Sequence, residues 1–430
     1  MANPFRIGIA GLGTVGGAVV GLLQDNADII AARAGRPVEI AAVSAKNKSK
    51  KRNTDVSAYE WVDDSVALAA HPGLDAVVEL VGGESGPAAA LVEKTLSAGR
   101  AVVTANKALL AHKGYELATL AEKNDAALMY EAAVAGAIPI IKTLREGLAA
   151  NRIDVVYGIL NGTCNYILTT MRETGRDFGD VLKEAQEMGY AEADPAFDID
   201  GIDAAHKLCI LSMLAFGVQS DFKALKISGV RNIHAKDIAY AHEFGCKIKL
   251  LGIVRCINSK IFQSMEPCFV PTESNIGAVE GVNNAVYLVG DFAGAGLSVG
   301  RGAGGAPTAS AVVADIIDLA RGHKVLPFGI PAAQMKKAPL ASMDEITGRF
   351  YMRLEAVDRP GVLADISAVM RDHDLSIEAM TQRGRDPDKS VSIVLTTHTV
   401  RQSDLERAVA VLADRKFITE SPCTIRIENF

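Results

Sequence analysis

Apolar and polar positions alternate along the chain in ways that predict distinct regions. In the first part, short apolar runs lead into stretches with helical periodicity, as over residues 5–10, 74–83 and 100–111. This pattern predicts repeated strand–helix units around a parallel sheet. Beyond about Pro139 the regular alternation is lost, and we expect a second domain of mixed α+β type over residues 139–301.

The second region contains two predicted helices that carry candidate functional residues. Residues 156–171 predict a strand, an Asn-Gly-Thr turn and a helix that is capped by Asn161 or Thr163. From about Asp203 the chain is again helical, and an apolar run follows Lys207. A stretch rich in carboxylates lies directly before this helix.

The C-terminal part predicts a separate domain. Residues 326–347 contain several prolines and are expected to form a linker. Residues 348–430 then show the element order βαββαβ, which is that of a ferredoxin-like fold. The whole chain is therefore expected to be an α/β protein of three domains.

Composition narrows the class of protein. A chain of 430 residues is too long for one core, and its 49% apolar and 22% charged residues are typical of a globular protein. The formal net charge of −6 argues against a nucleic-acid partner, which needs a basic face. The six cysteines form no CxxC pair and are expected to be reduced thiols. With no leader-like start and no membrane-length apolar run, we expect a cytoplasmic enzyme without a membrane partner.

The opening stretch FRIGIAGLGTVGGAVV places the motif GxGxxG between a predicted strand and a predicted helix. Gly11 permits the tight turn, Gly13 lets a pyrophosphate approach the backbone, and Gly16 lets the helix pack on the strand. The helix N-terminus offers free N–H groups to the phosphates. We therefore expect a Rossmann-like dinucleotide-binding domain over residues 1–138. A glycine-rich turn without a ligand is the alternative. The expected cofactor contacts are Gly11, Leu12, Gly13, Thr14, Val15 and Gly16.

The choice of dinucleotide rests on the end of the second predicted strand. That strand ends near Ser44 without the acidic residue that an NAD-specific site uses for the ribose hydroxyls. Lys46 and further cations follow it, and positive charge suits a 2′-phosphate. NADP(H) is therefore favoured, with Lys46 as a contact, and NAD(H) stays possible; a solvated basic loop is the alternative. Lys107, at the carboxyl end of a later strand, is also placed for a ligand contact.

The segment AEADPAFDIDGIDAAHK, residues 191–207, gathers five carboxylates before one lysine. Counted from Asp198 it does not match the ligand spacing of an EF-hand, and His206 has no second histidine beside it for a transition metal. Asp203 and Lys207 stand four residues apart on one helix face. They form either a surface salt bridge or a catalytic pair in which a partly desolvated lysine gives a proton to a carbonyl oxygen. The other carboxylates would then bind a cationic group of the substrate.

Seven motifs, in order over about the first 320 residues, give the chain a resemblance to the homoserine dehydrogenase family. They are GLGTVG from Gly11, VELVGG from Val78, TANKALLA from Thr104, EAAVAGAIPII from Glu131, GILNGTCNYIL from Gly158, GYAEADPAFDIDGIDAAHK from Gly189 and GAGGAPTASAVVADI from Gly302. The resemblance implies interconversion of aspartate 4-semialdehyde and homoserine with NAD(P)H, in the biosynthesis of threonine, methionine and isoleucine.

The resemblance also implies roles for single residues. Lys207 would be the general acid/base, Asp203 would position substrate or water, and Lys107 would lie between nicotinamide and substrate. Glu192 would bind the substrate's amino group. The remaining implied contacts are Asp198 and Thr163 for the substrate, Gly304 and Gly305 for the dinucleotide, and the backbone carbonyls of Glu131, Val134, Gly136 and Ile138 for a sodium ion. Residues 302–325 would complete the first domain, and a sheet of the second would pair across a dimer.

The loop at Asp358, Pro360 and Gly361 resembles the ligand loop of an ACT domain. The implied role is feedback control by an amino acid, with threonine as the expected effector and a homodimer or homotetramer as the expected assembly. A dimerisation module that binds nothing is the alternative. With no aspartate-kinase segment before the fingerprint, the chain is expected to be monofunctional.

Two other functions are compatible with these residues. One is a different NADP-dependent dehydrogenase of amino-acid aldehydes. The other is a regulatory protein that senses NADP and an amino acid without turnover. The presence of Glu192, Asp203 and Lys207 together argues against this second function.

Overall fold

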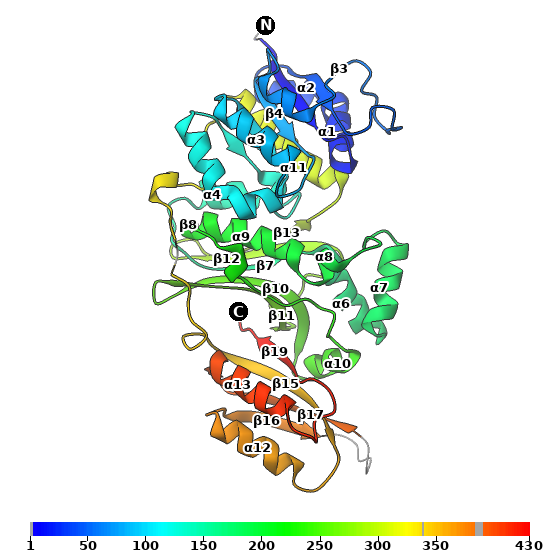
Figure 1. Ribbon diagram of the computed structural model, residues 1–430, viewed down its shortest axis with the longest axis vertical. Coiled ribbons are helices and arrows are strands. Elements are labelled where there is room, and N and C mark those ends of the chain that lie inside the picture. The colour runs from blue at the N-terminus through cyan, green and yellow to red at the C-terminus, as the bar shows by residue number, and fades with distance from the viewer. Residues whose placement is uncertain (1–2, 338, 383–389) are drawn as a thin grey trace.

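The computed structural model describes residues 3–337, 339–382 and 390–430. Figure 1 shows an elongated molecule with the N-terminal domain at one end and the C-terminal domain at the other. Within the described ranges, a six-stranded and an eleven-stranded sheet organise the fold. No helix of these ranges is both long and apolar enough to cross a bilayer.

The N-terminal sheet is wholly parallel, with the order β3-β2-β1-β4-β5-β6. Its strands are β1 (Phe5–Ala10), β2 (Val38–Ser44), β3 (Glu60–Trp61), β4 (Ala76–Glu79), β5 (Ala101–Thr104) and β6 (Leu128–Met129). This is the doubly wound order that the sequence pattern predicted, and its switch point lies between β1 and β4. The helices around it are α1 (Thr14–Asp25), α2 (Ala27–Ala34), α3 (Pro87–Ser97), α4 (Lys107–Lys123) and α11 (Gly305–Ala320).

Helix α11 joins this domain from far along the chain, because it packs against α1 and shares its apolar core. Val312 and Ile316 of α11 are fully buried in that core, as are Val19 and Val20 of α1. An apolar stripe at helical spacing on both helices explains the pairing.

The central part is an antiparallel array in the order β13-β12-β7-β10-β11. Its strands are β7 (Ile153–Ile159), β10 (Cys246–Ile257), β11 (Lys260–Pro271), β12 (Asn283–Gly290) and β13 (Gly294–Arg301). The larger helices of this part are α6 (Gly162–Thr174), α7 (Phe178–Glu187), α9 (Ile202–Phe216) and α10 (Ala235–Glu243), with the short α5 (Ile140–Lys142) and α8 (Ala196–Ile199). Helix α9 packs on β7, β10 and β11 and also meets α4 of the N-terminal domain.

The C-terminal domain has the strand order β19-β15-β17-β16, which is the ferredoxin-like arrangement. Its main elements are β15 (Thr347–Val357), α12 (Val362–Asp372), β16 (Ile377–Gln382), β17 (Ser390–Thr397), α13 (Gln402–Ala413) and β19 (Cys423–Ile427), with the short β18 (Val400–Arg401). Both helices bury their apolar faces against the sheet in one core.

The sheet of the C-terminal domain continues the central sheet. Strand β19 runs parallel to β11, with Cys268 opposite Arg426 and Phe269 opposite Ile427. The pairing covers an edge of β11 that would otherwise expose unpaired backbone groups. The sequence suggested two separate sheets, because pairing between strands so far apart leaves no local signal.

The segment expected to be a linker is likewise held to the central domain. Strand β14 (Lys336–Lys337) pairs with β8 (Val218–Gln219), and Leu340 bridges Ile261. A further short strand, β9 (Lys226–Ile227), pairs with β11. The connection to the C-terminal domain therefore lies along the central domain.

A buried ion pair also joins the two domains. Asp237 of α10 accepts hydrogen bonds from Arg353 Nε of β15 at 2.7 Å and from the Tyr351 hydroxyl at 2.9 Å. The side chains of Arg353 and Asp237 are 3% and 0% exposed. Removing Asp237 would leave the buried Arg353 guanidinium with the longer contact of its Nη1 to Glu355, at 3.3 Å, as its closest ion pair among the described residues.

We expect Asp237→Ala to lower the free energy of unfolding by about 3–5 kcal/mol, because the Arg353 charge would remain buried. Urea denaturation measures this. The double variant Asp237→Leu/Arg353→Met removes both charges and should recover most of the loss. The exposed pair of Arg371 with Asp372 provides the control, since Arg371→Ala should change stability by less than about 1 kcal/mol. A similar small change for Asp237→Ala would refute the assignment.

Candidate active site

A group of charged side chains, partly buried, lies where α4 of the N-terminal domain meets α9 of the central domain. Asp203 of α9 binds two ammonium groups: Lys207 Nζ lies 2.7 Å from its Oδ2 and Lys107 Nζ lies 2.8 Å from its Oδ1. The side chains of Asp203 and Lys207 are only 7% and 8% exposed, and that of Lys107 is 35% exposed. The pair predicted at i and i+4 exists, but it is a buried pair and not a surface salt bridge.

Three chain segments fix this group. Lys207 follows Asp203 by one turn of α9, and its Nζ also donates to the Leu160 carbonyl at the end of β7, at 2.8 Å. Lys107 is the first residue of α4, whose start is capped by the Asn106 side chain. An ammonium group has three donors, and among the described residues Lys207 contacts two acceptors, so one hydrogen is available to a ligand.

The charges of the group stabilise one another. Burial raises the pKa of Asp203, but the ammonium groups of Lys207 and Lys107 outweigh this and hold it well below its usual range. Burial lowers the pKa of Lys107, but the nearby carboxylates, Asp203 above all, raise it above its ordinary value. The arrangement therefore keeps the Asp203 carboxylate ionised and Lys107 charged at neutral pH.

Asn161 organises the acidic side of the site, a role that the sequence did not reveal. Its Nδ2 donates to Asp198 at 2.8 Å and to Asp203 at 3.1 Å, while its Oδ1 caps α6 by accepting from Cys164 N. Burial and the charge of Asp203 raise the pKa of Asp198. An Asn before a helix is an ordinary cap in sequence, and nothing local shows that its amide also reaches two carboxylates.

The segment that carries Glu192 lies beside this group. Glu192 is exposed, yet its charge contributes to the raised pKa of Lys107. The Thr163 hydroxyl donates to the Tyr190 carbonyl at 2.7 Å, so it holds this segment against α6. Of the other acidic residues, Asp194 accepts from Ala196 N within a turn and Asp200 pairs with Arg231.

His206 has a second histidine beside it, which the sequence pattern did not show. Its imidazole is buried, stacks on Phe222 and lies 3.3 Å from the ring of His112. Burial and the neighbouring His112 lower its pKa to about 4. The imidazole faces an aromatic group on the side of α9 that packs against α4. The helical pattern of the sequence alone does not distinguish that side from the side that faces solvent.

The fingerprint glycines have the geometry that their roles require. Gly11 has φ +96°, and a Cβ on Gly16 would overlap the Gly11 carbonyl oxygen. A Cβ on Gly13 would have no atom within 4 Å, so its surface is open for a ligand. Gly304 has φ +113°, and a Cβ on Gly305 would lie 3.0 Å from the Thr14 carbonyl oxygen, so the segment that precedes α11 lies against the fingerprint helix. Leu12 is mostly buried and packs in the core, and Val15 packs against it.

A buried carboxylate that the sequence analysis overlooked fixes the neighbouring loops. Glu79, at the end of β4, accepts from Val81 N, Gly82 N and the Thr104 hydroxyl at 2.6–2.9 Å. Thr104 in turn accepts from Asn106 N. A charged residue that ends an apolar strand was the available signal. This network sets the position from which α4 presents Lys107.

The basic segment after β2 folds back beside α1. The Thr54 hydroxyl donates to the Gly17 carbonyl at 3.0 Å, and the Lys48 and Arg52 side chains lie over the Trp61 ring. Lys46 is exposed, two residues past the end of β2. These cations therefore lie in the segment between β2 and β3, part of which contacts α1.

The loop predicted to bind sodium is buried and unusually shaped. Ala135 and Gly136 have φ of 56° and 52°. Within the described ranges, no donor contacts the carbonyl oxygens of Val134 and Gly136, whereas the Ile138 carbonyl accepts from Ile140 N. The Glu131 side chain accepts from Ile141 N and Lys142 N, one hydrogen bond on each carboxylate oxygen. Two buried carbonyls without donors suit a hard monovalent cation.

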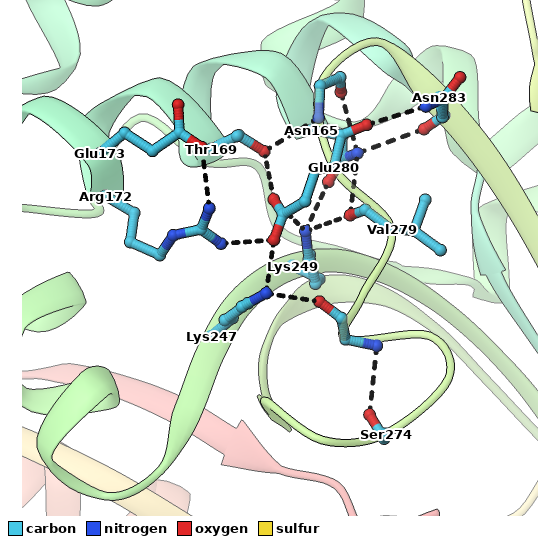
Figure 2. Close-up of polar contacts among 12 residues, drawn as sticks. Asn165, Thr169, Arg172, Glu173, Lys247, Lys249, Ser274, Val279, Glu280 and Asn283 are labelled. Atoms are coloured by element: carbon cyan, nitrogen blue, oxygen red, sulfur yellow. Dashed lines mark hydrogen bonds and ion pairs between the residues drawn. The ribbon is translucent and has the colours of Figure 1, made fainter.

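A charged cluster, defined here as Glu280 with Arg172, Lys247 and Lys249, anchors helix α6 behind the site (Figure 2). Glu280 lies in the loop before β12, and it also accepts from Thr169 of α6 at 2.9 Å. Burial raises the pKa of Glu280, but hydrogen bonds from Arg172 and Lys247 outweigh it and hold the value at about 2. Burial lowers the pKa of Lys249 to about 8, although the charge of Glu280 acts to raise it.

Comparison with known families covers most of the chain. The profile described as "Homoserine dehydrogenase, NAD binding domain" matches residues 11–131, that of "Homoserine dehydrogenase" matches residues 139–317, and that of the ACT domain matches residues 350–417. The homoserine dehydrogenase of Neisseria gonorrhoeae is 45% identical over 433 residues, with 99% of each chain covered. That of Pseudomonas aeruginosa is 41% identical, again with 99% of each covered.

Solved structures agree with these matches. The crystal structure of a homoserine dehydrogenase from Thiobacillus denitrificans has a TM-score of 0.92 at 42% identity and covers 99% of both chains. A hyperthermophilic archaeal homoserine dehydrogenase in complex with NADPH has a TM-score of 0.63 at 28% identity, and covers 74% of this chain and 97% of that one.

The charged cluster should give the protein a definite acid sensitivity. Because the folded pKa of Glu280 is about 2, below the ordinary 4.5, its stabilisation is present above pH 4.5 and is lost as the pH falls toward 2. We expect Glu280→Gln to lower the free energy of unfolding at pH 7 by about 1–2 kcal/mol, and to flatten its decline between pH 4.5 and 2. Denaturant unfolding at several pH values tests this. The exposed Glu187→Gln is the control, and parallel curves for Glu280→Gln and wild type would contradict the assignment.

Proposed function

The chain belongs to the homoserine dehydrogenase family, whose members are NAD(P)-dependent oxidoreductases acting on a CH–OH group, and we propose that Asp203, Lys207 and Lys107 form its catalytic group. The observation that carries the proposal is the single buried carboxylate shared by two lysines from two domains. The reaction interconverts L-aspartate 4-semialdehyde and L-homoserine.

In this proposal Lys207 moves the proton. When bound, the nicotinamide cofactor supplies a hydride to the aldehyde carbon or accepts one from the alcohol carbon. Lys207 gives the proton on its available Nζ hydrogen to the carbonyl oxygen as the aldehyde is reduced, and takes it back in the reverse direction. Asp203 and the Leu160 carbonyl fix the direction of that hydrogen, and Asn161 fixes Asp203.

The remaining carboxylates would receive the substrate's ammonium group. Glu192 is exposed and close enough to Lys107 to influence its pKa, and Asp198 is tied to the same Asn161 as Asp203. Lys107 then stands between the substrate and the nicotinamide. We assign Thr163 to holding the Glu192 segment, because its hydroxyl already donates to Tyr190.

We further propose that NADP(H) is preferred over NAD(H). Support comes from the basic segment that folds beside α1 and from the absence of an acidic residue at the end of β2. Gly11 to Gly16 would hold the pyrophosphate, Lys46 the 2′-phosphate, and Gly304 and Gly305 would cover the dinucleotide. A sodium ion would bind the carbonyls of Glu131, Val134, Gly136 and Ile138, of which those of Val134 and Gly136 have no other donor among the described residues.

The ACT domain is proposed to bind threonine as a feedback inhibitor. Gly361, with φ +96°, precedes α12, and the Asp358 side chain accepts from Gln382 of β16 at 3.3 Å. This geometry ties the loop of Asp358, Pro360 and Gly361 to the sheet and exposes Pro360 and Gly361. Pairing of ACT domains would give a homodimer or homotetramer.

We expect Lys207→Met to lower kcat about 10²–10⁴-fold, because it removes the proton donor. The dissociation constant for NADPH should stay within about twofold, since Asp203 keeps Lys107 as a partner. NADPH oxidation with aspartate semialdehyde measures the first and fluorescence titration the second, with NADH assayed in parallel to compare the two cofactors. Lys113→Met, on the exposed side of α4, is the control. A near-normal kcat for Lys207→Met would remove Lys207 from the mechanism.

Millimolar threonine is expected to inhibit the wild-type enzyme. Asp358→Ala should relieve that inhibition and leave turnover without threonine within about twofold, because the loop is remote from the catalytic group. Initial rates over a threonine series test this. Inhibition that persists in Asp358→Ala would place the effector elsewhere, and an uninhibited wild type would leave the ACT domain without this ligand.

A further inference from the structure

Asn284, near the start of β12, is a buried side chain whose polar atoms are unsatisfied among the described residues. It is 1% exposed, yet neither its Nδ2 nor its Oδ1 has a hydrogen-bond partner among the residues that the structure describes. Val286 and Leu288, on the same face of β12, belong to the core that includes α9. The amide therefore lies on the side of the sheet that carries the catalytic helix.

Two glycine backbones lie against this amide. A Cβ on Gly302 would overlap the Asn284 amide itself, and a Cβ on Gly162 would lie 3.5 Å from its Oδ1. Larger residues at these two positions would fill the space that the amide occupies. The amide is thus enclosed by the backbone of two segments, the start of α6 at Gly162 and the loop at Gly302.

These two segments belong to different halves of the proposed active site. Gly162 follows Asn161, which holds Asp198 and Asp203. Gly302 opens the segment that reaches Gly304 and Gly305, beside the fingerprint helix. Asn284 is therefore the side chain that touches both the segment proposed for the substrate and the segment proposed for the dinucleotide.

Asn284 and the start of α6 are held together, so the Gly302 segment is the part that must move if the amide is to be satisfied. Asn165 of α6 donates to the carbonyls of Gly281 and Asn283, and the charged cluster holds Glu280 nearby (Figure 2). A buried amide with no partner is unfavourable, and a small shift of the Gly302 segment would supply one.

We infer that Asn284 is a positioning residue that couples the binding of substrate and dinucleotide. When both ligands are bound, its amide hydrogen-bonds to the backbone of the Gly302 segment beside the start of α6, so the substrate and the dinucleotide favour the same position of that segment. The inference rests on the proposed placement of the two ligands. Such coupling is reciprocal, and it is measured as the ratio of affinities for one ligand with and without the other.

The test uses homoserine with NADPH, a pair that does not react because both are reduced. For the wild type, we expect saturating NADPH to tighten homoserine binding at least fivefold. Asn284→Leu, which is close to isosteric, should reduce this ratio to near one and leave the affinity for NADPH alone within twofold. Its melting temperature should be unchanged or higher, since the variant removes an unsatisfied buried amide. Asn284→Ala should show the same loss of coupling if leucine disturbs the packing.

Ser264→Ala is the matched control, because Ser264 is also fully buried with an unpartnered hydroxyl but lies on β11 between β10 and β9. It should keep the wild-type ratio. A wild-type ratio near one, or an unchanged ratio in both Asn284 variants, overturns the inference; a lower melting temperature with retained coupling would show a purely structural amide. Wild-type turnover of aspartate semialdehyde is measured separately, so failure of the proposed function is distinguished from failure of this one.

Discussion

The shared carboxylate of Asp203 is the interaction on which the arrangement of the site depends. It is buried, and a buried carboxylate is stable only with charged partners and hydrogen bonds around it. One partner, Lys207, comes from its own helix, and the other, Lys107, comes from the first helix residue after β5 of the other domain. The ion pair therefore joins the domains. Disturbing either domain would change the position of Lys207, the proposed proton donor.

The polar side chains around this carboxylate occupy the same kind of position. Each ends a strand or starts a helix, where backbone groups lack partners within their own element. Glu79 satisfies the loop after β4, Asn106 caps α4, and Asn161 caps α6 while it reaches Asp203. The same side chains that complete the secondary structure thus fix the proposed catalytic side chains, so a substitution at one of them would change both the stability and the geometry of the site.

The continuous sheet gives the regulatory domain a short connection to this site. Beyond β19, Glu428 accepts from the Tyr157 hydroxyl of β7 at 3.1 Å. Strand β7 runs on to Leu160, whose carbonyl accepts from Lys207, and to Asn161. Strand β7 and these two hydrogen bonds therefore connect the C-terminal domain to Lys207.

The sequence by itself determined what is local. The glycine fingerprint, the strand–helix alternation, the βαββαβ order and the i, i+4 pair of Asp203 and Lys207 follow from spacing along the chain, because each depends on residues within a turn or a strand of one another. Only the tertiary structure decided the rest. It places Lys107 beside Asp203, lets the Asn161 amide bond both Asp198 and Asp203, and buries His206. It also pairs β11 with β19 and encloses Asn284 between two backbone segments. These contacts join residues tens to hundreds of positions apart. Their existence depends on how sheets and helices pack, which leaves no periodic trace in either segment.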